Sequence, residues 1–294
     1  MTTSTPNHAP FESLLNFRDV GISINTLSSQ NLIKNGLFYR SARPDSVTTL
    51  DRQRLTGEYS IKTIIDLRTD SEHIGQSRKT TSSRMRSSPA LSPPDPAQPI
   101  KIDGVDYKEI NFNGPAYSKA LIKQLSYAHV AKLAGLYVLG YRNQAISVLG
   151  SNVMAQRGLT GLAEDSLAHC TAEVKEVFDV LSSPASYPLL VHCTQGKDRT
   201  GLVVLLVLML LRAPQVAIEK DYLLSESELR PEREERLKEI AAIGLPESFA
   251  GCDPEWAEQV SGWINEKYGG IESYLTRCGV SAAQMKAVSE MLAA

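Results

Sequence analysis

The sequence lacks an excess of charge of either sign. Its 294 residues include 31 Lys and Arg against 33 Asp and Glu, which gives a net charge of −2 at neutral pH. Proteins that bind nucleic acid over a large surface carry a strongly basic domain or stripe. The charge balance therefore argues against a nucleic-acid partner.

Long apolar runs are also missing. The longest, residues 202–211, is about half of the ~20 residues that a helix needs to cross a bilayer. The first residues, MTTSTPNHAPFESL, contain no apolar stretch of the kind that a signal peptide requires. We therefore expect no transmembrane segment and a cytoplasmic location.

Cysteine is scarce, with only four residues, at positions 170, 193, 252 and 278. None lies in a C-x-x-C pair, and none has metal-ligand spacing with the histidines. In a chain without an export signal we expect these thiols to be reduced. We expect neither a metal site nor a cofactor.

Short β-branched or apolar runs alternate with longer helical patterns. The expected strands lie within residues 16–24, 35–44, 61–66, 105–112 and 187–193. Strands that alternate with helices predict an α/β fold with a central, mainly parallel sheet flanked by helices. No linker divides the chain, so we expect a single domain over residues 1–294. Within it, residues 73–100 are rich in Ser, Thr, Pro and Arg and predict a flexible loop, whereas residues 117–161 are mostly helical in pattern.

The most informative stretch is LLVHCTQGKDRTGLVVLLVLMLL, residues 189–211. It predicts a buried strand, a short charged loop from Cys193 to Arg199, and a helix with no polar face. Ligands of open α/β sheets bind beyond the carboxyl ends of the strands, which is where this loop lies. Gly196 permits a positive φ, so the loop can turn successive N–H groups toward an anion. The helix N-terminus and the planar fork of Arg199 favour a phosphate group in the same place.

The same surroundings favour the thiolate form of Cys193, because the thiol lies at a helix N-terminus beside Lys197 and Arg199. A thiolate beneath a bound phosphate is a nucleophile directed at phosphorus. Attack would give a phosphocysteine that water then hydrolyses, with Arg199 stabilising charge on the phosphoryl oxygens.

The decamer HCTQGKDRTG, residues 192–201, matches the H-C-x5-R-[ST]-G signature of the cysteine-dependent protein tyrosine phosphatase superfamily. The chain resembles the tyrosine/serine phosphatase branch of bacteria and fungi, which includes the mycobacterial phosphatase B type. Further segments resemble landmarks of that branch in the same order: NFRDVG, GLFYRSA, IIDLRTDSE, KDYLLS and YGGIESYLTRCGVS. The resemblance covers nearly the whole chain apart from residues 73–99. It implies a fold like that of protein tyrosine and dual-specificity phosphatases.

The resemblance also implies roles for individual residues of the loop. Cys193 matches the nucleophile, Arg199 the phosphate-binding arginine, Thr200 a hydroxyl that contacts the sulfur, and His192 a residue that helps to set the thiolate. The substrate-binding positions are matched by Thr194, Gln195, Gly196 and Lys197. We expect phosphate or sulfate to bind in the loop. A helical lid in that branch corresponds to residues 117–161.

The general acid is the least determined residue. Asp198, inside the loop, is the first candidate, although Lys197 and Arg199 beside it favour its charged form over the protonated acid. Asp66, at the end of the strand in IIDLR, is the second candidate and is also expected to bind substrate. Asp66 and Arg68 can instead pair with each other or with Arg40.

Several functions remain open at this point. The first is a protein tyrosine phosphatase with broad specificity for phosphotyrosine, phosphoserine and phosphothreonine; a phosphoinositide phosphatase is the alternative. A catalytically weak module that binds phosphorylated ligands, and a rhodanese-type sulfurtransferase, belong to other classes. Arg199, at the sixth position after Cys193 and followed by Thr-Gly, favours phosphate ester chemistry.

Overall fold

The computed structural model describes residues 10–73 and 101–294. In these ranges the chain forms a five-stranded sheet with strand order β1-β2-β5-β3-β4. The strands are β1 (Arg18–Asp19), β2 (Phe38–Ser41), β3 (Thr63–Asp66), β4 (Asp106–Glu109) and β5 (Leu189–His192). β5 is parallel to β2 and β3, β3 is parallel to β4, and β1 is antiparallel to β2. The predicted α/β fold with a mainly parallel central sheet is confirmed.

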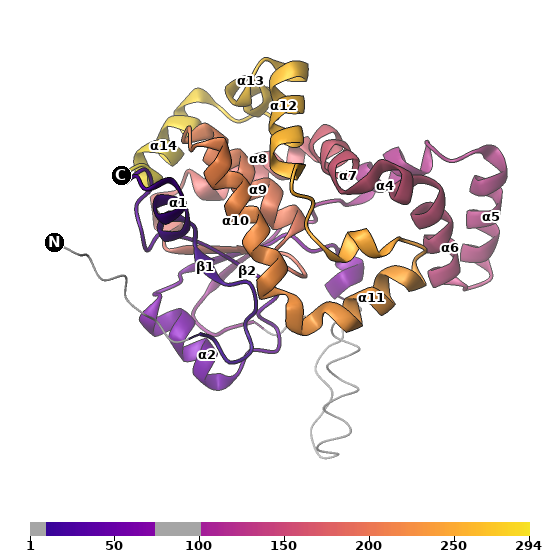
Figure 1. The fold of residues 1–294 in the computed structure, drawn as a ribbon, viewed down its shortest axis with the longest axis horizontal. Helices are drawn as coiled ribbons and strands as arrows, with labels where there is room; N and C mark the ends of the chain where they lie inside the picture. The colour runs from indigo at the N-terminus through magenta and orange to yellow at the C-terminus, as the bar shows by residue number, and fades with distance from the viewer. Residues whose placement is uncertain (1–9, 74–100) are drawn as a thin grey trace.

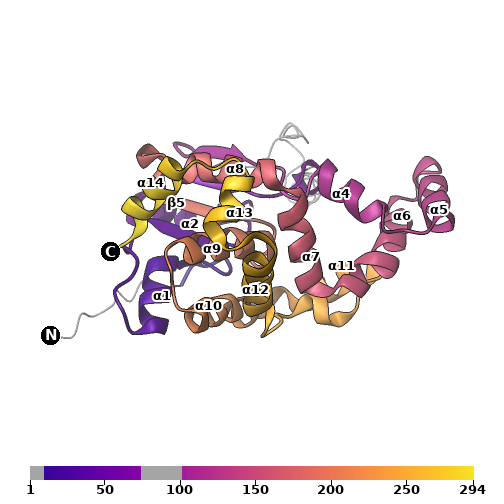
Figure 2. The ribbon, with the colours of Figure 1, turned by 90° about the horizontal axis from the view of Figure 1, so that it is seen from above.

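Helices surround the sheet (Figures 1 and 2). The first half of the chain contributes α1 (Val20–Ser28), α2 (Thr49–Gln53), the π-helix η1 (Arg54–Glu58), α4 (Pro115–Ile122), α5 (Tyr127–Val138) and α6 (Arg142–Leu149). They are followed by the π-helix η2 (Gly150–Met154), α7 (Ala155–His169), α8 (Thr171–Leu181), the 3₁₀ turn η3 (Pro184–Ser186), α9 (Asp198–Leu210) and α10 (Gln215–Glu228). The chain ends with the 3₁₀ turn η4 (Arg230–Glu232), α11 (Arg233–Ala242), the 3₁₀ turn η5 (Glu247–Ala250), α12 (Trp256–Tyr268), α13 (Ile271–Arg277) and α14 (Ala282–Leu292).

The two faces of the sheet are buried in different apolar cores. Neighbouring residues of a strand point to opposite faces, so Leu189 and Val191 enter the large core with α8 and α9, whereas Leu190 enters a smaller core. The smaller core also contains Ile64 of β3 and Leu55 of η1. Burial on both faces explains why β5 is a continuous apolar run rather than an alternating one.

The apolar helix α9 lies between β5 and a set of other helices. It packs against β5 and against α7, α10, α12 and α13. Residues 200–208 are all buried, which accounts for the absence of a polar face. The loop before α9 is therefore attached to a rigid helix in the interior.

The carboxyl ends of three neighbouring strands are level. Ser41 of β2 and Asp66 of β3 both pair with His192 of β5. Since these strands are parallel, the segments that follow them leave the sheet at one edge. The predicted loop at Cys193 and the segment after Asp66 are thereby brought together.

The prediction of a strand over residues 16–24 is wrong beyond its first residues. After the two residues of β1 the chain turns into α1, because the Asp19 side chain accepts hydrogen bonds from Gly21 N at 2.8 Å and Ile22 N at 3.2 Å and so caps the helix. The alternation of Val20, Ile22 and Ile24 resembles a strand, but only Val20 and Ile24 of these three are buried.

The segment 117–161 is helical, as expected, and runs from α4 to α7. Figures 1 and 2 show α5 and α6 projecting from the side of the molecule that lies away from both chain ends. The predicted flexible loop lies outside the described residues except for its first residue. No helix within residues 10–73 and 101–294 combines the length and the apolarity needed to span a bilayer.

Candidate active site

The loop between β5 and α9 begins with Cys193. This residue follows β5 directly, and α9 begins five residues later at Asp198. Cys193 is buried, with 2% of its surface exposed. Gly196 has a φ of +65°, and a Cβ atom there would lie 2.0 Å from the carbonyl oxygen of Ser41 in β2. The loop passes so close to β2 that only glycine fits at this position.

The carbonyl groups of residues 194–196 are all held by donors from outside the loop. Arg43 donates to Thr194 O through its backbone N at 3.2 Å and through Nη1 at 3.3 Å. Asn16 Nδ2 donates to Gln195 O at 2.9 Å and to Gly196 O at 3.1 Å. Arg40 Nη2 also donates to Gly196 O at 2.8 Å. In a trans peptide the N–H points opposite to the C=O. The N–H groups of these peptides are therefore turned inward, as an anion-binding nest requires.

A buried ion-pair network holds Arg40 under the loop. Its Nη1 lies 2.7 Å from Asp221 Oδ2, and both side chains are 1% exposed. Arg18 Nε approaches the other oxygen of the same carboxylate at 2.8 Å. Burial would raise the pKa of Asp221, but the two guanidinium groups outweigh it and keep that pKa well below its usual range. The carboxylate thus stays charged and anchors both Arg18 and Arg40.

Arg199, at the start of α9, has one edge of its guanidinium occupied and one edge available. Nη1 donates to Leu67 O at 3.0 Å and to Glu72 Oε2 at 2.6 Å, and Nη2 donates to Glu72 Oε1 at 2.6 Å. A guanidinium has five N–H donors, so Nε–H and the second hydrogen of Nη2 have no partner among the described residues. These two donors lie along one edge, which is the arrangement that grips two phosphate oxygens.

Glu72 is a site residue that the sequence did not single out. Its carboxylate also accepts hydrogen bonds from Thr194 Oγ1 at 2.5 Å and from Thr69 N at 2.9 Å. Burial would raise the pKa of Glu72, but the charge and the hydrogen bonds of Arg199 outweigh it, and the pKa is held well below its usual range. Glu72 is therefore an ionised partner of Arg199 and not a proton donor.

Asp66 lies beneath the site rather than in it. It is fully buried, lies 2.7 Å from Arg68 Nη2, and faces His192 Nε2 at 3.5 Å. Arg68 forms a second ion pair with Asp45. Burial would raise the pKa of Asp66, but His192 and Arg68 together lower it. The pairing of Asp66 with Arg68 is confirmed, and this environment disfavours both roles expected of Asp66, proton donor and substrate ligand.

His192 supports the loop from below. Its Nδ1 lies 3.1 Å from the carbonyl oxygen of Cys193, and its side chain is completely buried. Burial lowers the pKa of His192, against the opposing charge of Asp66.

Two neighbouring loop residues differ in exposure, although Lys197 Nζ lies 3.5 Å from Asp198 Oδ1. Asp198 lines the pocket above Cys193, and 46% of its side chain is exposed. Lys197 is fully buried, and its Nζ donates to Phe249 O at 3.2 Å and to Gly251 O at 2.6 Å. Lys197 does not line the pocket. Its ammonium group binds these two carbonyls and does not make the contact with substrate that was expected.

Thr194, Gln195 and Thr200 are the remaining loop residues with an expected role. Thr194 and Gln195 line the pocket together with Cys193 and Arg199. Thr200 is buried, and its hydroxyl has no hydrogen-bond partner within residues 10–73 and 101–294. That hydroxyl is available for the contact with sulfur that the family resemblance implies.

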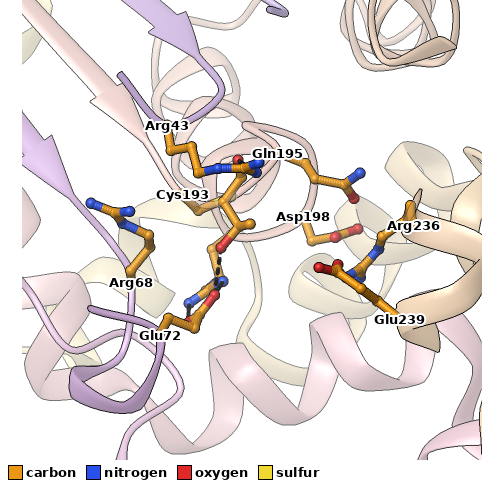
Figure 3. A pocket seen from close by; sticks show the side chains of 10 residues that line it. Arg43, Arg68, Glu72, Cys193, Gln195, Asp198, Arg236 and Glu239 are labelled. Atoms are coloured by element: carbon orange, nitrogen blue, oxygen red, sulfur yellow. Dashed lines mark hydrogen bonds and ion pairs between the residues drawn. The ribbon is translucent and has the colours of Figure 1, made fainter. Parts of the chain in front are cut away.

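The pocket above Cys193 has a volume of about 260 Å³. Its far side is formed by Arg236 and Glu239 of α11, which face Asp198 and Gln195 across the pocket in Figure 3. Arg236 Nη1 lies 3.5 Å from Glu239 Oε2. Neither residue belongs to a recognisable motif, and only the path of α11 brings them to the site.

Comparisons with known proteins agree with this geometry. A family model described as the tyrosine phosphatase family matches residues 9–294. A tyrosine-protein phosphatase of Nostoc commune is 28% identical over 161 residues, which is 49% of this chain and 54% of that protein. The triple specificity protein phosphatase PtpB of Mycobacterium tuberculosis is 30% identical over 124 residues, which is 37% of this chain and 45% of that protein. The chain thus spans about half the length of these curated relatives.

The matched region contains every element that shapes the loop, from Asn16 and Arg40 to Cys193, Arg199 and Asp221. With this match over nearly its whole length, the chain belongs to the tyrosine phosphatase family.

Proposed function

We propose that this chain hydrolyses phosphomonoesters of proteins through a phosphocysteine intermediate, and that it accepts phosphotyrosine, phosphoserine and phosphothreonine. One observation carries the proposal: Cys193 lies at the base of a pocket whose loop carbonyls are turned outward and whose Arg199 keeps one edge of its guanidinium available. Such a pocket suits a tetrahedral dianion held directly above a sulfur nucleophile.

In the first step the Cys193 sulfur attacks phosphorus and the bond from phosphorus to the ester oxygen breaks. Arg199 and the inward N–H groups stabilise the charge on the three remaining oxygens. Asp198 gives its proton to the departing oxygen, which leaves as an alcohol or phenol.

In the second step a water molecule attacks the phosphocysteine. Asp198, now ionised, takes a proton from that water, the sulfur–phosphorus bond breaks, and inorganic phosphate and the Cys193 thiolate are regenerated. The Thr200 hydroxyl stabilises the departing sulfur. No metal or cofactor takes part in this scheme.

The breadth of specificity is supported by the name of the mycobacterial relative, a triple specificity phosphatase. Phosphoinositide hydrolysis is the alternative substrate class. A catalytically weak module that only binds phosphorylated ligands is the alternative of another class, and the presence of both Cys193 and Arg199 weighs against it.

We further propose that the helices of residues 117–161 act as a lid. α5 contains no buried residue, and it and the turn after it expose Tyr127, Tyr137, Val138 and Leu139. Such side chains are expected to gain a contact in another state of the protein. Hydrogen exchange of α5 should slow when vanadate occupies the site, and unchanged exchange would contradict the lid.

The function is tested by measuring phosphate release from p-nitrophenyl phosphate, from phosphotyrosine and phosphoserine peptides, and from phosphoinositides. We expect Cys193→Ser to abolish turnover on every substrate. The matched control is Cys252→Ser, a half-buried cysteine outside the pocket, which should retain activity. Acid quenching of the wild type during turnover should trap phosphate on Cys193, detectable by mass spectrometry. Turnover that survives Cys193→Ser would overturn the proposal.

A further inference from the structure

A second cavity adjoins the catalytic pocket. It has a volume of about 410 Å³, and four of its lining residues also line the catalytic pocket: Glu72, Asp198, Arg199 and Arg236. The rest of its lining is mainly apolar and includes Met154, Leu159, Leu162, Ala163, Phe249 and Trp256. We call this cavity the apolar chamber. Because the two cavities share these residues, one ligand can contact both of them at the same time.

The floor of the chamber is fixed to the helix turn that carries Arg199. Leu202, in the first turns of α9, lines the chamber beside Trp256. Trp256 is 3% exposed and stacks on Tyr222 with ring centroids 4.4 Å apart. A Cβ atom on Gly201 would come within 3.4 Å of the Trp256 ring, so the helix and the indole are in close contact. This floor is therefore a closely packed surface built on buried aromatic rings.

The far wall of the chamber is held by Lys197. The buried ammonium group donates to the carbonyls of Phe249 and Gly251, and Phe249 itself lines the chamber. The wall also packs tightly against η2, since a Cβ atom on Gly150 would lie 1.9 Å from Ile243 O. The loop that surrounds the phosphate position thus also fixes the shape of the neighbouring chamber.

Three polar side chains that line the chamber alone each have an atom engaged in a hydrogen bond. Ser166 Oγ donates to Leu162 O at 2.8 Å, Thr69 Oγ1 donates to Glu72 Oε2 at 2.9 Å, and Asn113 Oδ1 accepts from Cys170 Sγ at 3.4 Å. A polyhydroxylated group placed there would lose hydrogen bonds to water and find few partners in return. Aromatic and thioether side chains instead suit an apolar ring.

We propose that the apolar chamber is a substrate subsite that takes an aromatic group attached beyond the ester-bearing part of the substrate while the phosphate lies on residues 193–199. This inference rests on the proposed phosphatase function. It defines the preferred substrates as phosphomonoesters with a bulky aromatic extension, and it disfavours a sugar-like polyol in the same position.

The test compares phenyl phosphate with 4-biphenylyl phosphate. Their leaving phenols differ little in acidity, so the ratio of the two kcat/KM values reports binding of the second ring. For the wild type we expect the biphenylyl ester to be preferred by about tenfold or more, the effect of burying one ring-sized apolar group. Equal kcat/KM values for the two esters would overturn the proposal.

Chamber variants locate the effect. Ala163 of α7 is 5% exposed and lines the chamber, so Ala163→Phe should fill it and bring the ratio toward one. Ile146 lines the chamber at its rim and is 48% exposed, so Ile146→Glu folds readily and should lower the ratio severalfold. The control is Ala168→Phe, on the same helix but in a different pocket, with the wild-type ratio expected. A ratio that both chamber variants leave unchanged would refute the inference.

Failure of the inference is distinguishable from failure of the proposed function. If the wild type hydrolyses phenyl phosphate and Cys193→Ser does not, the phosphatase function stands, whatever the biphenylyl ratio. If the wild type releases no phosphate from either ester, the proposed function fails first.

Discussion

Glu72 and Arg199 form a two-pronged ion pair in which Oε1 and Oε2 each lie 2.6 Å from one terminal nitrogen of the guanidinium. The carboxylate comes from the segment after β3 and the guanidinium from the first turn of α9. Because Glu72 occupies one edge of the guanidinium, it fixes how Arg199 lies in the pocket that Cys193 also lines. Glu72 is a positioning residue in this arrangement, acting through Arg199.

Replacement of Glu72 by Gln removes the charge and sets an amide against Arg199. We expect kcat/KM for p-nitrophenyl phosphate to fall by about 10²-fold, as for other misplaced substrate-gripping groups. Inhibition by inorganic phosphate should weaken in parallel, while a fall in stability alone would leave it unchanged. Tighter phosphate inhibition in the variant would show instead that Glu72 blocks the site.

The same ion pair predicts a pH dependence of stability. The pKa of Glu72 is lowered from its ordinary value of 4.5 in the folded protein. A lowered folded-state pKa means that the stabilisation is fully present above the unfolded-state value and is lost as the pH falls through the folded-state value. In urea titrations, the difference in unfolding free energy between wild type and Glu72→Gln should be constant above about pH 5.5 and shrink below about pH 4.5. A difference that grows on acidification would contradict this assignment.

The roles of Asp198 and Asp66 can be told apart by how strongly each substitution slows esters with different leaving groups. Asp198→Asn should slow hydrolysis of phenyl phosphate by about 10²- to 10⁴-fold, because the phenolate needs a proton, and slow p-nitrophenyl phosphate much less. Asp66→Asn should affect both esters alike. It should also lower the unfolding free energy by about 3–5 kcal/mol, since it leaves buried Arg68 with one partner fewer. Steady-state kinetics and denaturant titration decide, and equal effects of Asp198→Asn on the two esters would remove it as the acid.

Gly196→Ala tests the shape of the loop. The new methyl group would meet the Ser41 carbonyl at a φ that disfavours alanine, so the loop must open and turnover should fall by at least about 10²-fold. Gly57→Ala is the matched control, because a Cβ atom there meets nothing within 4 Å. Full activity of Gly196→Ala would mean that the outward carbonyl arrangement is not needed.

Lys197→Met tests the connection between the loop and the segment around η5. The variant leaves the carbonyls of Phe249 and Gly251 without their donor, and the unfolding free energy should fall by about 1–3 kcal/mol. Hydrogen exchange of residues 245–252 should quicken more than that of α9. Lys286→Met, at an exposed ion pair, should change neither quantity. Unaltered exchange in residues 245–252 would show that Lys197 does not hold the wall.

The loop, the strand before it and the helix after it could be predicted because the residues that specify them are contiguous. A buried strand, a loop with Cys193, Gly196 and Arg199, and an apolar helix follow one another within 23 residues. Local chemistry and strand polarity are enough to place such a unit at the carboxyl edge of a parallel sheet.

The partners of the loop could not be predicted in the same way. Thr69 and Glu72 form the T-x-x-E pattern of a helix cap, and the hydrogen bond from Thr69 N to Glu72 is present. The sequence pattern indicates only this local role of Glu72. Its contact with Arg199 depends on the pairing of β3 with β5, which brings the two residues together. One signal in the sequence could have identified Glu72: it is an acidic residue shortly after β3, the strand next to β5.

Side-chain direction was the other limit. Lys197 and Asp198 are adjacent and their charged groups lie 3.5 Å apart, yet Lys197 is buried against η5 and only Asp198 lines the pocket. Sequence spacing alone does not say which neighbour faces a ligand. The strand expected over residues 16–24 fails for a related reason, because the Asp19 cap overrides the β-branched alternation.

The anchoring of the loop has a consequence for the synthesis of the protein. Asn16 holds a carbonyl 180 positions further along the chain, and Arg18 reaches Asp221 across 203 positions. At roughly 5–20 residues per second, a ribosome needs about 10–40 s to supply the second partner after the first. The amino-terminal segment therefore spends that interval without its acidic counterpart, at the stage when nascent chains meet chaperones. The loop therefore cannot gain all of its anchors until the chain has been made as far as Asp221.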